Sequence, residues 1–247
     1  MERWTAQTAR GRLIRLPLRL VPSSAVVHVL SGANRGRRWV VGSGVHGYWL
    51  GGYERRHQQL LANLLRPGNV FFDIGAHVGF YSLLASRRVG SGGRVVAFEP
   101  SPRNVGYLKR HVALNEADNV EIVEAAVSSS NGLVRFDASG DSSMGQVRDD
   151  AGTPVPSVSL DAWADEHDVH PSVMKIDVEG HEPRVLQGAT RILTESRPAI
   201  VLSVGPDSVP SCRALLETHG YLMDPIMTVP SPTEFACIPL PHQRPSD

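Results

Sequence analysis

The sequence predicts an α/β protein in which a mostly parallel sheet is flanked by helices. Short runs of β-branched and aromatic residues alternate with segments of helical periodicity, and several of the runs are apolar on both faces. Parallel neighbours need a crossover connection, and helices on both faces of a sheet demand strands that are apolar throughout. The chain of 247 residues, 41% hydrophobic and without net charge, suffices for one domain with a substantial core.

Five runs are expected to form strands, and four intervening segments to form helices. The strands are Val70–Ile74, Arg94–Glu99, Val120–Val127, Val173–Asp177 and Ala199–Val204. The helices are Arg55–Leu65, with Leu60, Leu61, Leu64 and Leu65 on one stripe, Gly79–Val89, Pro102–Asn115 and Pro183–Leu193. Strand alternating with helix is typical of a parallel sheet.

Two regions depart from this alternation. Residues 133–160 combine short extended runs with a Gly/Ser/Asp-rich stretch at 139–152, which predicts a hairpin with a flexible loop near the ligand edge of the sheet. Residues 206–247 hold many prolines, and a final strand is expected at Glu234–Leu240. We therefore expect a single domain over 1–247: an N-terminal extension at 1–46, a core at 47–205, and completion of the sheet at 206–247.

The net charge and the length of the apolar runs limit the kinds of partner that we expect. Zero net charge gives no overall attraction to nucleic acid. The first twenty residues hold five arginines, Arg3, Arg10, Arg12, Arg15 and Arg19. They would suit peripheral contact with lipid headgroups or an anionic substrate, but Pro17 and Pro22 interrupt any long amphipathic helix, which favours a solvated or strand-forming lead-in. No run approaches the roughly 18 apolar residues of a transmembrane segment, and no apolar signal core is present, so a cytoplasmic protein is expected.

The segment DIGAHVG, residues 73–79, follows the first strand, at the edge of the sheet where ligands bind. Gly75 lets the backbone turn sharply and approach a ligand closely, and Gly79 opens the next helix with room for tight packing. The pattern differs from the dinucleotide motif Gly-x-Gly-x-x-Gly, and the carboxylate of Asp73 would repel a pyrophosphate. An ammonium group or a network of hydrogen-bond donors suits this loop better.

The second strand ends in Glu99, 26 residues after Asp73, where a carboxylate can accept both hydroxyls of a ribose. A nucleoside without phosphates, joined to an amino-acid end, describes S-adenosylmethionine. Two alternatives remain: a nicotinamide-dependent oxidoreductase on a Rossmann sheet, which the missing glycine and Asp73 disfavour, and a non-catalytic binding protein with the same fold.

Six ordered blocks between Gly47 and Val204 closely resemble the FkbM-type methyltransferase family. They are GYERRHQQLLANLLRPGNVFFDIGAHVGFYSLLAS, GRVVAFEPSPRNVGYLKRHVALN, VEIVEAAVSSSNG, VSLDAWA, MKIDVEGHEPRVLQGA and RPAIVL. The resemblance implies the class I methyltransferase fold, a Rossmann-like, seven-stranded and mostly parallel sheet with one antiparallel strand. It also implies methyl transfer from S-adenosylmethionine.

The resemblance also implies a set of cofactor-binding residues. Glu54 and the loop would contact the methionine end, with Asp73 acting directly or through water on the amino group; Glu99 would accept the ribose. The full set is Glu54, Asp73, Gly75, Ala76, His77, Gly79 and Glu99, with Pro100 and Ser101 lining the adenine and Ala126 at its edge.

The block KIDVEGHE, residues 175–182, lies at the end of the fourth strand, where a class I methyltransferase presents its acceptor. Alternation puts Lys175 and Asp177 on one face, with Asp177 at the rim. Asp177 or His181 is expected to receive the proton of the acceptor. The structural alternative is a charge cluster in which Lys175 pairs with a carboxylate and Glu182 supports a helix N-terminus.

Metal binding competes for the same carboxylates. Some class I O-methyltransferases hold a divalent cation between acids at the ends of the fourth and fifth strands, and Asp177 could be the first of them. Ser203 stands where the family commonly carries an acid, so no metal site is predicted. The expected function is S-adenosylmethionine-dependent O-methylation of a small-molecule hydroxyl on a sugar, glycolipid or natural product.

Overall fold

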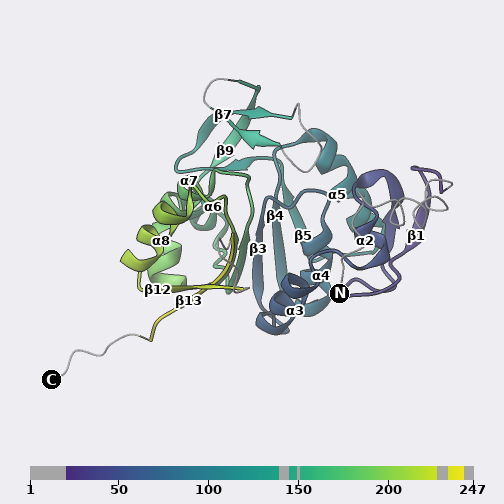
Figure 1. Cartoon of the computed structure of the whole chain (residues 1–247), viewed down its shortest axis with the longest axis horizontal. Coiled ribbons are helices and arrows are strands. Elements are labelled where there is room, and N and C mark those ends of the chain that lie inside the picture. The colour runs from purple at the N-terminus through teal and green to yellow at the C-terminus, as the bar shows by residue number, and fades with distance from the viewer. Residues whose placement is uncertain (1–20, 139–144, 149–150, 227–232, 242–247) are drawn as a thin grey trace.

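The computed structural model describes residues 21–138, 145–148, 151–226 and 233–241. Within these residues seven strands form a central sheet in the order β12-β13-β11-β10-β3-β4-β5 (Figure 1). Its strands are β3 (Val70–Ile74), β4 (Arg94–Phe98), β5 (Val120–Val123), β10 (Val173–Ile176), β11 (Ala199–Ser203), β12 (Tyr221–Pro225) and β13 (Glu234–Pro239). The pairs from β5 to β11 are parallel, whereas β13 is antiparallel to both of its neighbours. The expected class I methyltransferase fold is confirmed.

Alternation along the central strands sends successive side chains to two cores. Phe72 of β3 packs with α6 (Leu160–His167), α7 (Glu182–Gln187) and α8 (Val209–Thr218), through side chains such as Leu160, Leu186 and Leu216. Phe71 packs on the opposite face with α3 (Arg55–Leu64) and α4 (Phe80–Val89). The sheet is therefore buried on both faces, which explains strands without polar alternation.

The order of the chain reverses between β3 and β10. From β3 it proceeds through β4 to β5 on one side, with α5 (Pro102–Leu114) as a connection, and β10 then pairs with the other side of β3. In open parallel sheets, ligands bind outside the carboxyl ends of the strands at such a reversal. The fold thus directs attention to the ends of β3, β4 and β10.

The prediction of one strand over Val120–Val127 is wrong, because this segment forms two strands in different sheets. The strand β5 ends at Val123, where the N–H of Ala125 donates to the carbonyl of Val123 at 2.9 Å and turns the chain. Ala126 then enters a four-stranded sheet ordered β6-β9-β7-β8. Its strands are β6 (Ala126–Val127), β7 (Gly132–Asp137), β8 (Gln146–Val147) and β9 (Thr153–Val158).

The antiparallel pair of β7 and β9 confirms the expected hairpin. Of the Gly/Ser/Asp-rich stretch between these strands, residues 139–144 and 149–150 lie outside the described residues.

The expected helix Pro183–Leu193 is also divided. The helix α7 ends at Gln187, and a π-helical turn, η3 (Ile192–Ser196), follows. The second segment has its own cap, because the carboxylate of Asp161 accepts the N–H groups of Arg191 and Ile192 at 2.9 and 3.0 Å. Helices α3, α4 and α5 begin and end within one residue of the expected bounds.

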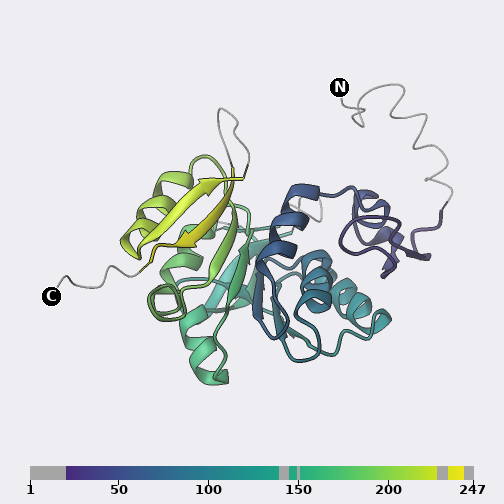
Figure 2. The same ribbon diagram turned by 90° about the horizontal axis from the view of Figure 1, so that it is seen from below.

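The N-terminal segment forms an antiparallel ribbon of β1 (Val26–His28) and β2 (Arg38–Val40), followed by a 3-10 turn, η2 (Val41–Ser43), and α2 (Gly47–Leu50). His111 of α5 fastens the ribbon: its Nε2 accepts the N–H of Val40 at 3.1 Å, and its Nδ1 donates to the carbonyl of Val78 at 2.7 Å. Figure 2 shows the described N-terminal segment and strands β12 and β13 at opposite ends of the molecule.

The arginine-rich lead-in at residues 1–20 lies outside the described residues. None of the helices in the described part of the chain is long and apolar enough to cross a membrane.

Candidate active site

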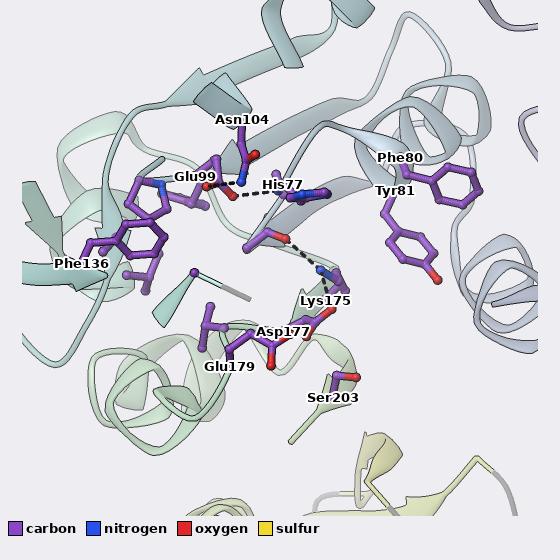
Figure 3. Close-up of a pocket in the computed structure, with 18 of the residues that line it drawn as sticks. His77, Phe80, Tyr81, Glu99, Asn104, Phe136, Lys175, Asp177, Glu179 and Ser203 are labelled. Atoms are coloured by element: carbon purple, nitrogen blue, oxygen red, sulfur yellow. Dashed lines mark hydrogen bonds and ion pairs between the residues drawn. The ribbon is translucent and has the colours of Figure 1, made fainter. Parts of the chain in front are cut away.

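A cavity of about 230 Å³ opens where β3, β4 and β10 end. Its walls come from the loop after β3, the end of β4, the small sheet and the residues that follow β10. Figure 3 shows Glu99 and Asn104 on one side of this cavity, and Asp177, Glu179 and Ser203 on the opposite side. The cavity thus occupies the position that the reversal of strand order indicates.

The loop after β3 packs closely against two neighbouring strand ends. Gly75 has φ +76°, and a Cβ added there would lie 2.0 Å from the carbonyl oxygen of Asp177. The N–H groups of Gly75 and Ala76 both donate to the carbonyl of Phe98, at 3.1 and 3.0 Å. Only glycine fits this position, and the loop is fixed between the ends of β10 and β4.

Glu99 presents two fixed carboxylate oxygens to the cavity. Its Oε2 accepts the N–H of His77 at 2.8 Å, and its Oε1 accepts the N–H of Ser101 at 3.0 Å and Nδ2 of Asn104 at 3.3 Å. The residue is only 4% exposed, and burial raises the pKa of its carboxyl group despite these donors. Each oxygen retains acceptor capacity for a hydroxyl of a ligand.

Lys175 lies at the meeting point of the loop and β10. Its Nζ donates to the carbonyl of Gly75 at 2.9 Å and lies 3.3 Å from Oδ2 of Asp177 and 3.8 Å from Oδ1 of Asp73. Burial alone would lower the pKa of this ammonium group, but the carboxylates of Asp177 and Asp73 outweigh burial and raise it. Lys175 is therefore a buried cation within the wall of the cavity.

Asp73 is fully buried beside Lys175 and is not among the residues that line the cavity. Its Oδ2 accepts the hydroxyl of Ser82 at 2.6 Å. Burial raises the pKa of its carboxyl group, while Lys175 and Ser82 oppose the change.

Aromatic side chains that the sequence analysis missed form one wall. Tyr48, Tyr53 and Phe80 pack together, with ring centroids 4.5 Å apart for the two tyrosines and 5.3 Å for Tyr53 and Phe80. The hydroxyl of Tyr81 donates to Oε2 of Glu54 at 2.6 Å. Burial raises the pKa of Tyr48 to about 12, so its hydroxyl stays protonated. The local signal in the sequence is that Tyr48 and Tyr53 precede Glu54 closely and that Phe80 and Tyr81 follow Gly79.

The structure brings most of the expected residues to this cavity. Those that line it are Glu54, Gly75, Ala76, His77, Glu99, Pro100, Ala126 and Asp177. Those that do not are Asp73, Gly79, Ser101 and His181. Ser101 acts on Glu99 through its N–H, and Gly79 packs on Leu108. His181 precedes α7, and its Nε2 lies 3.0 Å from the hydroxyl of Ser128.

Among the described residues, no group of three or more His, Cys, Asp and Glu side chains is arranged to hold a metal ion.

Two known methyltransferases are similar in sequence to this chain. It is 29% identical to hexuronic acid methyltransferase AglP of Haloferax volcanii over 58% of this chain and 59% of that protein. It is 28% identical to methyltransferase sdnD of Sordaria araneosa, over 65% of this chain and 76% of that protein. The match therefore spans less than two thirds of the Haloferax protein.

The fold is shared with the solved structure of methyltransferase FkbM from Methylobacillus flagellatus. The TM-score is 0.50 at 17% identity, over 79% of this chain and 56% of that chain. In addition, residues 73–223, more than half of the chain, match the model of the methyltransferase FkbM domain. The resemblance seen in the sequence is thereby confirmed: the chain belongs to the FkbM methyltransferase family, whose methyl donor is S-adenosylmethionine.

Proposed function

We propose that the protein is an S-adenosylmethionine-dependent O-methyltransferase that acts on a hydroxyl group of a sugar or of a sugar-bearing small molecule. The observation that carries the proposal is that Glu99 and Asp177 line the same cavity from different strand ends. Glu99 offers paired oxygens to a ribose, and Asp177 offers a carboxylate to an acceptor hydroxyl.

The lining of the cavity fits S-adenosylmethionine. Glu99 is held by three donors in an orientation that suits two ribose hydroxyls. Phe98 and Phe136 supply apolar surface for an adenine, and Glu54, held by Tyr81, supplies a carboxylate for an ammonium group. The fixed turn at Gly75 would let a ligand approach the backbone closely. When bound, the cofactor supplies an electrophilic methyl group on a sulfonium.

In this proposal Asp73 supports the cofactor site indirectly, through Lys175. Because it is buried beside Lys175 and does not line the cavity, its role is to hold the ammonium group of Lys175. Lys175 in turn holds the carbonyl of Gly75, and thus the loop. Asp73 is therefore a positioning residue.

Asp177 is the proposed proton acceptor. The hydroxyl of an acceptor must lose its proton as the new O–C bond forms, and a carboxylate within hydrogen-bond reach can take it. Oδ2 of Asp177 faces Lys175, and its side chain is 31% exposed, which leaves Oδ1 for the acceptor. His181 does not line the cavity, so we assign the proton to Asp177 and the larger share of the rate to positioning.

We propose further that transfer needs no added divalent cation. The ammonium of Lys175 already lies between the carboxylates of Asp73 and Asp177, and it would repel a metal ion there. Turnover should therefore persist in the presence of a chelator. Loss of turnover that added magnesium restores would contradict this assignment.

Similarity to a hexuronic acid methyltransferase supports a sugar as the acceptor class. The experiment is a titration of the purified protein with S-adenosylmethionine and, separately, with nicotinamide dinucleotides, followed by transfer of a labelled methyl group to a panel of glycosides. Binding of S-adenosylmethionine with label on a glycoside oxygen supports the proposal. Binding of a nicotinamide cofactor alone would favour the oxidoreductase alternative, and cofactor binding without transfer to any acceptor would favour a binding protein.

A further inference from the structure

A second hollow, here named the acid recess, adjoins the cavity at the ends of β10 and β11. Its volume is about 340 Å³, and it shares Asp177, Glu179 and Ser203 with the cavity. Beyond these shared residues it extends past Gly180 and Glu182 to Thr233, which precedes β13. A ligand in the recess would thus lie beside Asp177, on the side of the cavity opposite Glu99 (Figure 3).

The lining of the recess is strongly one-sided in charge. Asp177, Glu179 and Glu182 contribute three carboxyl groups. None of the described residues that line the recess is Lys, Arg, His or an aromatic residue. The ammonium of Lys175, in the wall of the neighbouring cavity, is already engaged by the carbonyl of Gly75 and by two carboxylates. The recess therefore attracts positive charge and repels negative charge.

Glu182 gives independent evidence for a ligand. It is 1% exposed, and its Oε1 accepts the N–H groups of Val178 and Gly180 at 3.3 and 2.9 Å. Its Oε2 has no hydrogen-bond partner among the described residues. A buried carboxylate oxygen without a donor is costly, so a donor from a ligand would stabilise it.

The repulsion between the acids has the same consequence. Partial burial of its carboxyl group raises the pKa of Glu179, and the charges of Asp177 and Glu182 raise it further. Burial likewise raises the pKa of Glu182. A cationic group among these carboxyl groups would relieve their repulsion and form charge-assisted hydrogen bonds, which are stronger than neutral ones.

We propose that the acid recess is the acceptor subsite and that it selects the acceptor by charge: an amino sugar is preferred to a neutral sugar, and a neutral sugar to a sugar acid. The inference rests on the proposed function, because it assumes that Asp177 meets the acceptor. A sugar acid would bring its carboxylate among three acids. The acceptor preference of this chain would then differ from that of the hexuronic acid methyltransferase to which it is similar.

The test uses three matched methyl glycosides, of glucosamine, glucose and glucuronic acid, which differ in one charged group. With S-adenosylmethionine at saturation, kcat/KM should fall from the first to the second and from the second to the third, by about tenfold at each step. Added salt should narrow both differences. A glucuronide used as well as the glucoside, or a glucosaminide used no better than the glucoside, overturns the inference.

A binding measurement separates this inference from the proposed function. The dissociation constants of the three glycosides are measured by calorimetry on the protein loaded with S-adenosylhomocysteine. If no glycoside is methylated, the proposed function fails for these acceptors, but the order of binding still decides the inference. Equal binding of the three, or the reverse order, overturns it.

One variant tests the source of the selectivity. Glu179 lines the recess and is exposed. Glu179→Gln therefore removes a charge from the recess without disturbing buried packing. It should reduce the preference for glucosaminide over glucuronide by about threefold or more. Glu166→Gln removes the same charge from an exposed position of α6 outside both hollows, and should leave the preference unchanged. Equal behaviour of the two variants contradicts the assignment.

Discussion

Lys175 and Asp73 are direct neighbours across the parallel pair of β10 and β3, with Nζ and Oδ1 3.8 Å apart. Both side chains are buried, and Oδ1 of Asp73 has no hydrogen-bond partner among the described residues. The ammonium group is therefore the main compensation for a carboxylate buried at the end of β3. A buried ion pair of this kind is costly to break from one side, because the remaining charge is left without a partner.

The first prediction concerns stability. Lys175→Met should lower the free energy of unfolding by about 3 kcal/mol or more, because it leaves Asp73 uncompensated. Urea unfolding followed by circular dichroism measures the change. The matched control is Lys109→Met, which breaks a pair with Glu124 in which both side chains are more than half exposed, and it should cost less than about 1 kcal/mol. Equal losses of unfolding free energy in the two variants would show that the buried pair stabilises the fold no more than the exposed pair does.

The second prediction concerns the cofactor. Glu99→Gln should weaken the binding of S-adenosylmethionine by about 1.5–3 kcal/mol, because one carboxylate oxygen that accepts hydrogen bonds becomes an amide donor. Calorimetry measures the affinity. Glu121→Gln, on the next strand and paired with Arg94 away from the cavity, should leave the affinity unchanged. Undiminished binding in Glu99→Gln would refute the ribose assignment.

The third prediction separates the two candidate proton acceptors. Asp177→Asn should lower kcat by about 10²-fold, within the usual contribution of a general base, and should change the affinity for S-adenosylmethionine little. His181→Ala should reduce kcat far less, because the imidazole does not line the cavity and lies beside Ser128. Steady-state kinetics with an identified acceptor compares them. The opposite ranking would return the role of base to His181.

The sequence predicts those parts of the site that depend on local pattern. The turn at Gly75 and the carboxylate at Glu99 follow from residue types at strand ends, and the structure has both on the cavity. Asp73 meets Lys175 only through the pairing of β3 and β10, so the loop pattern could not predict that its carboxylate lies beside a buried ammonium group.

Contacts between distant segments also explain the features that the sequence analysis missed or predicted wrongly. The run Val120–Val127 is continuously strand-like, and nothing in it reveals the turn that the N–H of Ala125 makes with the carbonyl of Val123. The wall of Tyr48, Tyr53 and Phe80 arises from segments that meet only in the folded chain. Local propensity predicts the elements, whereas tertiary packing decides which of their side chains meet.

The fourth prediction concerns pH. Burial lowers the pKa of His111 from 6.5 to about 4, and its Nε2 must remain unprotonated to accept the N–H of Val40. The unfolded chain takes up the proton first as pH falls. The stability that neutral His111 contributes is therefore complete above about pH 6.5 and is lost between about pH 6.5 and 4, by up to about 1.4 kcal/mol per pH unit.

Urea unfolding across this interval should show a shallower pH dependence for His111→Gln than for the unaltered protein. His170→Gln provides the control, because His170 is more than half exposed and should leave the slope unchanged. Identical slopes for His111→Gln and the unaltered protein would mean that His111 does not stay neutral in the folded state.

The bond between His111 and the β1–β2 ribbon has a consequence for building hybrid enzymes. The family match begins at residue 73, yet three residues that precede it support the site. Val40 bonds to His111 of α5, Tyr48 to His77 of the loop after β3, and Glu54 to Tyr81 of α4. A chimera that exchanged only residues 73–223 between relatives would carry the loop and lose its N-terminal supports. A segment exchanged between relatives should therefore begin no later than the β1–β2 ribbon, upstream of the residues that match the family.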